Sequence, residues 1–222
     1  MIAVHRGAPP VELNRNIHEL APDQRRYNNL SADTKTALKK SLLESQGHIC
    51  AYCMRRIDGP EDAKLEHIYP QSRSIAEGNP GQTLDYGNML AVCKGGDGDP
   101  DRPYSEQTCD THKKDAILSI NPSSQDDIDT IYYLPNGEIG SSDPAFDDDL
   151  RKTLNLNCEA AYLPQDRQRV YASMQRAIAK RAPRTHEAKR EFARKKLMAL
   201  ESSDRKEPFV GVMLYRLKKW AR

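Results

Sequence analysis

Four cysteines in the middle of the chain have the spacing of a metal-binding site. Cys50 and Cys53 form a C-x-x-C pair, and Cys93 and Cys109 follow at longer intervals. A tight turn lets both sulfurs of a C-x-x-C pair face one ion, and two further thiolates complete the set that Zn²⁺ prefers. The fifteen residues between Cys93 and Cys109 add only a modest closure entropy. The sequence therefore predicts a structural zinc site, the alternatives being other partners for Cys50 and Cys53 or free thiols.

Between and just after these cysteines lie polar residues of the types that hydrolyse phosphodiesters. Glu66 and His67 are adjacent, Asn88 follows, and Asp110 and His112 come directly after the last cysteine. Hydrolysis needs a group that takes a proton from water and a positive charge near the oxygens that become more negative. A neutral imidazole such as that of His67 can take the proton near pH 7. On a regular strand, however, the side chains of Glu66 and His67 would face opposite sides.

The order of these pieces resembles the zinc-stapled form of the HNH, or ββα-metal, nucleases. The resemblance implies that His67 is the general base, that Asn88 ties the loop backbone together and orients it, and that Glu66 is a ligand of a catalytic ion. Asp110 stands where that family usually has His or Asn as the second metal ligand, and His112 is the alternative. Two carboxylates favour Mg²⁺ or Mn²⁺, whereas an imidazole favours softer ions.

Four basic residues near these motifs are candidate contacts to nucleic-acid phosphates. Lys113 and Lys114 follow the expected second metal ligand, where a cation can hold the substrate or offset developing charge. Arg55 and Arg56 follow the first cysteine pair, where a solvated turn is an equally good interpretation.

Helix signals precede the first cysteine pair. Residues 33–46 carry apolar side chains at helical spacing, with Ser31 or Asp33 as the N-cap and Gly47 as the C-cap. This helix should anchor the first cysteine turn. We expect residues 1–30, which contain several prolines, to be irregular apart from a short helix near their end.

The central stretch itself should form a ββα unit. Residues 65–68 and 88–92 are predicted as its two strands, and Cys109 should lie at the start of its helix. Residues 71–82 and 94–107 are rich in Gly, Ser, Asp or Pro and are expected to be loops.

The C-terminal half is predicted to be a hairpin followed by helices. Asn136-Gly137 between β-prone residues predicts a hairpin over 131–139. Helical spacing of apolar residues follows over 150–156, 166–181, 185–200 and 208–220. The fold class expected is therefore α+β and mostly helical, with a zinc-stapled ββα core. The segments expected are an N-terminal arm and helix (1–47), the zinc and nuclease core (48–120), and a hairpin with a basic helical region (121–222).

Charge is distributed unevenly along the chain. Residues 97–150 carry 14 acidic and 3 basic side chains, whereas residues 151–222 carry 19 basic and 7 acidic ones. A basic region is typical of a protein that binds phosphate backbones, although solvated helix faces give the same pattern. No apolar run is long enough to span a bilayer and the first residues lack the core of a signal peptide, so we expect a cytoplasmic location. In that reducing compartment the fifth cysteine, Cys158, is expected to be a buried thiol.

Beyond the core, the chain resembles a narrower branch, the HNH nuclease subunits (PtuB) of Septu anti-phage defence systems, which are also found beside retrons. The features that carry this resemblance are the wide Cys93 to Cys109 spacing, Pro70-Gln71-Ser72 after the acid-His pair, the Asn-Gly hairpin, and Leu154-Asn155-Leu156-Asn157 followed by Arg167.

The resemblance also implies partners. It implies a nuclease that cuts DNA, with RNA such as tRNA left open, in a complex with a PtuA-like ATPase of the ABC/SMC type. Beside a retron, a reverse transcriptase and its msDNA would join these partners. The apolar stripe from Phe209 to Trp220 looks exposed and, with the acidic insertion, would be a docking surface for the ATPase. Two alternatives remain, a zinc-stapled nucleic-acid-binding module without catalysis and a stand-alone restriction-type HNH nuclease.

Overall fold

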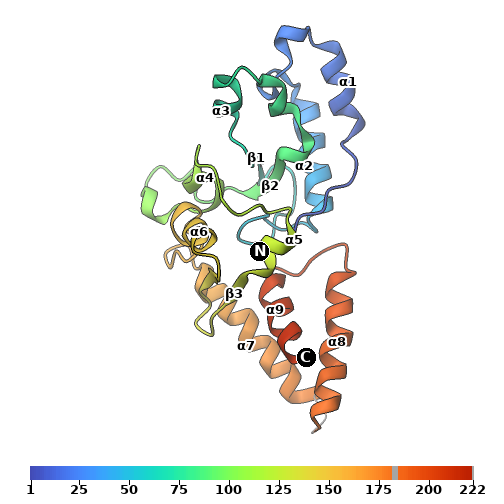
Figure 1. Ribbon diagram of the computed structural model, residues 1–222, viewed down its shortest axis with the longest axis vertical. Coiled ribbons are helices and arrows are strands. Elements are labelled where there is room, and N and C mark those ends of the chain that lie inside the picture. Colours follow the sequence, from blue (N-terminus) through green and yellow to red (C-terminus); the bar gives the residue numbers. More distant parts are fainter. Residues whose placement is uncertain (182–184, 222) are drawn as a thin grey trace.

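The computed structural model describes residues 1–181 and 185–221. Figure 1 shows an upper body, which contains the N-terminal helices, and a group of C-terminal helices that extends away from it. We call these three helices the leg; they are α7 (Leu163–Arg181), α8 (His186–Glu201) and α9 (Val210–Trp220). The fold is mostly helical α+β, as predicted.

The body is built from short elements. Its strands are β1 (Ala63–His67), β2 (Met89–Cys93), β3 (Ile131–Tyr133) and β4 (Ile139–Ser141). Its α-helices are α1 (Val11–Glu19), α2 (Ala32–Ser45), α3 (Gln71–Ala76), α4 (Cys109–Lys113), α5 (Gln125–Asp129) and α6 (Pro144–Asp148). Its 3₁₀ turns are η1 (Pro22–Gln24), η2 (Tyr27–Asn29), η3 (Pro80–Leu84), η4 (Tyr86–Asn88) and η5 (Tyr104–Glu106), and η6 (Asp149–Thr153) is a π-helical turn.

Two antiparallel sheets of two strands each organise the body. β1 pairs with β2, with Ala63 opposite Cys93 and His67 opposite Met89. β3 pairs with β4 across the predicted Asn-Gly turn, in which Gly137 has φ +88°. A two-stranded sheet is marginal in water without other elements packed on it, so helices must hold the β1–β2 ribbon in place.

Helix α2 supplies that support. Ser31 is its N-cap, because the Ser31 hydroxyl accepts a hydrogen bond from the Thr34 N–H at 3.2 Å. Leu38 and Leu42 are fully buried one turn apart on α2, and α2 contacts both strands of the ribbon. At its C-terminal end, the Gln46 amide donates to the Ala91 carbonyl at 2.7 Å and accepts from the Ala91 N–H at 2.9 Å. The first helix predicted from sequence therefore fixes β2 directly.

The N-terminal segment is more ordered than we predicted. Residues 11–19 form α1, which follows Pro10 and buries Leu13. Proline is favoured at helix starts because its ring fixes φ, a signal that we interpreted as irregular chain. The short helix predicted over 23–30 is instead the two turns η1 and η2. The segment also wraps the ribbon, since Arg6 Nε donates to the Met89 carbonyl at 2.7 Å.

The loop predicted over residues 71–82 was also partly wrong. It contains α3 and the start of η3, which contact each other. Ser74 is fully buried, and its hydroxyl reaches the Pro70 carbonyl at 3.3 Å and the Gln82 side-chain oxygen at 3.2 Å. The polar composition of this segment predicted a loop. Hydrogen bonds order it instead, and they leave no apolar pattern in the sequence.

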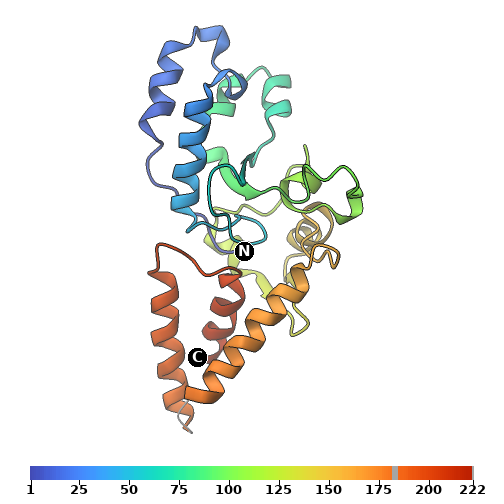
Figure 2. The ribbon, with the colours of Figure 1, turned by 180° about the vertical axis from the view of Figure 1, so that it is seen from behind.

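The apolar stripe on α9 is not an exposed surface. Phe209, Val212 and Leu217 are buried, and Trp220 is half-buried. The stripe packs inside the leg, because α9 contacts both α7 and α8, and Figure 2 shows the three helices side by side. The prediction of a docking surface on this stripe is therefore wrong, since a buried face cannot receive a partner.

Arg167 joins the leg to the body. Its side chain is only 1% exposed, and it donates to the Gly137 carbonyl at 2.5 Å, the Leu156 carbonyl at 2.7 Å and the Asn157 side-chain oxygen at 2.9 Å. The Asn-Gly turn, the 154–157 segment and α7 thus meet at one guanidinium. In residues 1–181 and 185–221, no helix is both long and apolar enough to cross a membrane.

Candidate metal centre and catalytic site

The four cysteines predicted as ligands form one cluster. Their Sγ atoms all lie within 4.8 Å of one another. The separations are 3.6 Å for Cys53 and Cys93, 3.7 Å for Cys93 and Cys109, and 3.9 Å for Cys50 and Cys109. Zn–S bonds of about 2.3 Å in a tetrahedral site place the sulfurs roughly 3.8 Å apart. The cluster therefore fits a structural Zn²⁺ ion.

The backbone aims each thiol at the cluster. The Met54 N–H donates to the Cys50 carbonyl at 2.9 Å and closes the C-x-x-C turn. Cys93 is the last residue of β2, and Cys109 is the first residue of α4. The Cys109 N–H donates to the Leu154 carbonyl at 2.9 Å, so the segment before α7 holds the last cysteine in place.

Beside this cluster, Glu66 of β1 and Asp110 of α4 are neighbours. Glu66 Oε1 lies 2.7 Å from Lys113 Nζ and accepts a hydrogen bond from the Tyr52 hydroxyl at 3.0 Å. Asp110 Oδ2 lies 2.7 Å from Lys64 Nζ. Two acidic side chains and two ammonium groups thus meet where the ribbon packs on α4.

The pKa values of the two acids are shifted in opposite directions. Burial and then the neighbouring Asp110 raise the pKa of Glu66 to about 8, against the opposing effect of Lys113. Burial acts to raise the pKa of Asp110 too, but hydrogen bonding to Glu66 and Lys64 outweighs it and leaves that pKa below its usual value. Like charges held together disfavour double ionisation, and a cation between two carboxylates removes that penalty. The oxygen donors suit Mg²⁺ or Mn²⁺.

His67 is held in one orientation. Its Nε2 lies 3.0 Å from the Thr83 carbonyl, which can only accept, so Nε2 carries the proton. Nδ1 is then an acceptor, and no group in residues 1–181 and 185–221 donates a hydrogen bond to it. The Tyr27 ring packs edge-on against the imidazole, with 5.0 Å between ring centres. Burial lowers the pKa of His67, although the Thr83 hydrogen bond partly opposes it. The imidazole is therefore neutral at pH 7.

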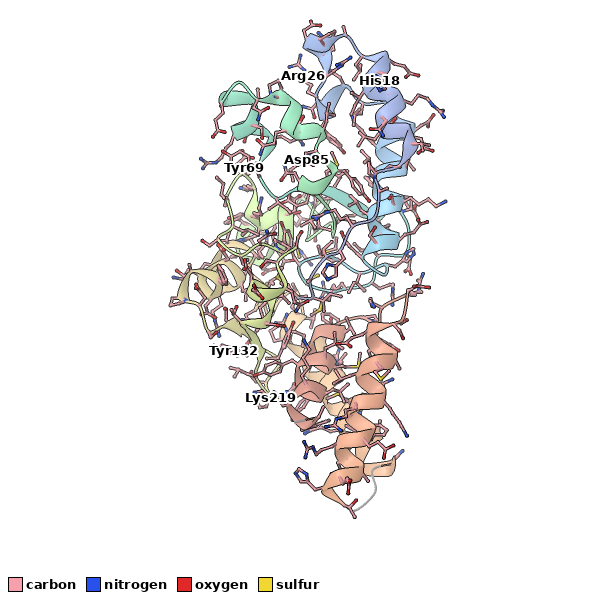
Figure 3. The ribbon with its side chains drawn as sticks, turned by 45° about the vertical axis from the view of Figure 1, so that its right-hand side comes forward. His18, Arg26, Tyr69, Asp85, Tyr132 and Lys219 are labelled. Atoms are coloured by element: carbon pink, nitrogen blue, oxygen red, sulfur yellow. The ribbon has the colours of Figure 1, made fainter. Side chains whose placement is uncertain are left out.

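Asn88 fastens the chain just after His67. Its side-chain oxygen accepts from the Tyr69 N–H at 2.7 Å, and its side-chain nitrogen donates to the Tyr69 carbonyl at 3.0 Å. The Ile68 N–H also donates to the Asn88 carbonyl at 2.9 Å. Both backbone groups of Tyr69 are thus bound across the loop. Figure 3 labels Tyr69 on the upper part of the molecule.

The carboxylates and the imidazole line one hollow of about 330 Å³. The residues that line it include Lys64, Glu66, His67, Asp110 and Lys114. β1 ends at His67 and the chain bends directly afterwards, so the neighbouring acid and imidazole both reach the hollow despite strand alternation. The expected base and both expected carboxylates therefore share one surface.

The other residues predicted for the site lie elsewhere or are differently engaged. His112 Nδ1 lies 2.9 Å from the Thr153 carbonyl, and its ring stacks on Tyr104 with 4.2 Å between ring centres. The structure thus places Asp110, rather than His112, beside Glu66. The side chain of Lys113 is fully buried against Glu66.

The two arginines after the first cysteine pair make internal contacts. Arg55 forms an ion pair with Asp166 at 3.3 Å. Arg56 donates to the Gly47 and His48 carbonyls, both at 3.1 Å. Their contact with nucleic acid stays a prediction, and so does that of the two lysines of α4 and its C-cap.

Sequence reasoning missed four residues of the site. Lys64 lies two positions before Glu66, so strand alternation alone could have placed both on one face. Tyr52, Tyr27 and Thr83 reach Glu66 or His67 only through the tertiary fold. No local pattern marks those three.

Comparison with known proteins gives two distant relatives, and no family model matches the chain. One relative, from Escherichia coli, is described as a candidate HNH endonuclease of retron Ec83. It is 34% identical over 80 residues, which cover 34% of this chain and 31% of the relative. The other, a candidate HNH endonuclease of retron Vc95 from Vibrio cholerae serotype O1 biovar El Tor, is 29% identical over 128 residues, 56% of this chain and 58% of the relative. The chain is a distant homologue of both. The matched segments span less than two thirds of either relative.

Proposed function

We propose that the chain is a metal-dependent HNH endonuclease that hydrolyses nucleic-acid phosphodiester bonds. The observation that carries this proposal is the shared hollow, in which a neutral imidazole held by a carbonyl faces the same space as Glu66 and Asp110. The descriptions of the two distant homologues support it.

The residues have distinct roles in this reaction. Glu66 and Asp110 would hold a Mg²⁺ or Mn²⁺ ion, which would supply a Lewis acid for the charge that develops in phosphodiester hydrolysis. His67 Nδ1 takes a proton from a water molecule as the water oxygen bonds to phosphorus and the bond from phosphorus to the leaving oxygen breaks. Solvent protonates the leaving oxygen and later removes the proton from His67. Asn88 keeps the backbone after His67 in position.

The charge of the leg supports nucleic acid as the substrate class. Several exposed cations of α7 and α8 have no acidic partner within 4.0 Å in the part of the chain that the structure describes; they are Arg176, Lys180, Lys189, Arg194 and Lys196. Lys219 of α9 also lies on the leg, as Figure 3 shows. Such cations bind phosphate backbones without reading sequence.

Removing two leg cations should weaken DNA binding and make the binding less dependent on salt concentration. In the double variant Arg176→Gln and Lys180→Gln, the logarithm of the association constant should fall less steeply with the logarithm of salt concentration. The slope should decrease by about 2, since each lost phosphate contact removes roughly 0.9. Fluorescence anisotropy with a labelled duplex at several salt concentrations measures it. Lys195→Gln is the control, because Lys195 is already paired with Glu191, and an unchanged slope in the double variant would argue against leg binding.

Loss of the Thr83 hydroxyl should reduce cleavage without unfolding the chain. Thr83 is fully buried, and its hydroxyl accepts from the Tyr27 N–H at 3.0 Å and donates to the Pro80 carbonyl at 2.6 Å. Thr83→Val removes both bonds and loosens the carbonyl that orients His67. We expect a cleavage rate lower by about tenfold or more, since small displacements of catalytic groups are costly. Thr36→Val is the control, because Thr36 is exposed on α2; thermal unfolding of both variants separates misorientation from instability.

The direct test of the proposed function is cleavage by the purified chain. Plasmid DNA and total RNA are incubated with it in Mg²⁺, Mn²⁺ or EDTA, and the products are separated on gels. We expect cutting of at least one substrate with a divalent cation and none in EDTA. Cutting that persists in EDTA would contradict the metal-dependent reaction. The variant Glu66→Gln keeps the side-chain volume but loses the charge, so with Mg²⁺ or Mn²⁺ present it should cut as little as the wild-type chain does in EDTA.

The proposed biological setting is an anti-phage defence complex with a PtuA-like ATPase. Support comes from the Septu-type sequence features and from the retron association of both homologues. Co-expression with an ATPase encoded beside the gene, followed by size-exclusion chromatography, tests it. Elution of the two proteins apart would count against the complex and leave the nuclease proposal intact.

A further inference from the structure

Lys64 is the accessible cation at the two carboxylates. Its Nζ lies 2.7 Å from Asp110 Oδ2, 3.3 Å from Asp97 Oδ2 and 3.3 Å from the Thr111 hydroxyl, and its side chain is 31% exposed. Lys113, the ammonium group on Glu66, has a side chain that is 0% exposed. Lys64 also lines the hollow, whereas Lys113 is not among the residues that line it. A molecule in the hollow can therefore reach Lys64.

The counter-charges of Lys64 leave it available to a ligand. Asp97 belongs to the insertion between the last two cysteines, and its side chain is 58% exposed, so this pair is weak in solvent. Asp110 is the stronger partner, but it is also an expected ligand of the divalent cation. An ion bound there takes over the carboxylate and repels the ammonium group unless a negative group lies between them.

We propose that Lys64 binds a non-bridging oxygen of the scissile phosphate and is a catalytic residue of the hollow. The proposal rests on the proposed function. The phosphate entering the hollow supplies the counter-charge that Asp110 gives up, and a fixed cation beside the phosphate oxygens stabilises the charge they gain in the transition state. The sequence-based candidates for this role were the lysines of α4 and its C-cap.

Lys114 is the nearest competitor for this role. It is exposed and lines the same hollow, and its Nζ lies 4.4 Å from the centre of the Tyr104 ring, a contact that is weak at an exposed position. Lys114 has no ion pair with either Glu66 or Asp110 in the described part of the chain. We therefore expect its removal to weaken substrate binding with a smaller effect on the rate.

The test compares Lys64→Met with Lys94→Met in the full chain. Lys94 is a matched control, since it is exposed and paired with Asp62 at 3.4 Å, and it does not line the hollow. We expect Lys64→Met to lower the cleavage rate at saturating Mn²⁺ by about 10²-fold, and Lys94→Met to change it less than about twofold. Mn²⁺ affinity, measured by calorimetry without substrate, should be unchanged or tighter in Lys64→Met because a competing cation is gone.

Two results would overturn the proposal. Cleavage by Lys64→Met at the wild-type rate would show that the ammonium group does not contact the reacting phosphate. A loss of Mn²⁺ affinity that matches the loss of rate would show that Lys64 acts only by positioning Asp110. Lys64→Arg should recover part of the rate, since it restores a cation at the same place.

A binding measurement keeps this proposal separate from the proposed function. In a His67→Ala background with Mn²⁺, adding Lys64→Met should weaken binding of a 20-nucleotide DNA about tenfold. If the His67→Ala variant and the His67→Ala, Lys64→Met double variant bound the DNA equally well, the proposed role of Lys64 would be overturned. If the wild-type chain cuts no nucleic acid with any metal ion, the nuclease proposal fails, and the binding result still decides whether Lys64 contacts phosphate.

Discussion

Cys109→Ser should remove bound zinc and sharply lower the stability of the chain. Cys109 is fully buried in the four-sulfur cluster and begins α4, which carries Asp110. Structural zinc sites contribute on the order of 10 kcal/mol of binding free energy that is also folding free energy. We expect the zinc content to fall to near zero and the unfolding midpoint to fall by more than about 10 °C. Metal analysis and thermal unfolding measure both.

Cys158→Ser is the matched control for this experiment. Cys158 is also buried, but its Sγ lies near the Glu106 carbonyl at 3.6 Å and outside the cluster. Its replacement should leave the zinc content unchanged. Removing zinc from the wild-type chain with a strong chelator should reproduce the Cys109 variant. Full zinc content in Cys109→Ser would mean that this sulfur is not a ligand.

His67→Ala should abolish nucleic-acid cleavage while the zinc content and fold remain. A positioned general base contributes typically 10²–10⁴-fold to a rate, and His67 is the imidazole that lines the hollow with both carboxylates. Among the described residues, its side chain makes one hydrogen bond, to the Thr83 carbonyl, and packs against the Tyr27 ring; neither contact involves a cysteine of the cluster. We expect a rate lower by about 10³-fold, together with a normal zinc content.

His186→Ala is the control for that measurement, because His186 is exposed at the start of α8 on the leg. It should cut at the wild-type rate. If His67→Ala cut as fast as the wild-type chain while keeping its zinc, the hollow would have no catalytic role. The non-catalytic zinc-stapled binding module would then be the better interpretation.

Local signals in the sequence were sufficient for several elements in which neighbouring residues determine the structure. Ser31 caps α2 through a residue three positions away, and the Asn-Gly turn sets the β3–β4 hairpin. The cysteine spacing predicted a cluster that the fold confirms. In each case the deciding interaction involves a turn or cap with a known preference.

Several features that sequence did not predict depend on distant residues. Strand alternation separates Glu66 from His67, and only the bend after β1 brings both to the hollow. Thr83 meets His67 across 16 positions of sequence through its carbonyl, and every residue type has a carbonyl. The apolar stripe of α9 was visible as a pattern, but no pattern states which helix covers it.

The position of Cys93 has a consequence for how the hollow is assembled. Cys93 ends β2 opposite Ala63, and the same five-pair ladder sets His67 opposite Met89 at its other end. A slip of one residue would turn every side chain of β2 to the other face and carry the Cys93 sulfur away from its three companions. A zinc ion bound by all four sulfurs would therefore favour the aligned ribbon over the slipped one. The aligned ribbon is also the one in which Glu66 and His67 line the same hollow.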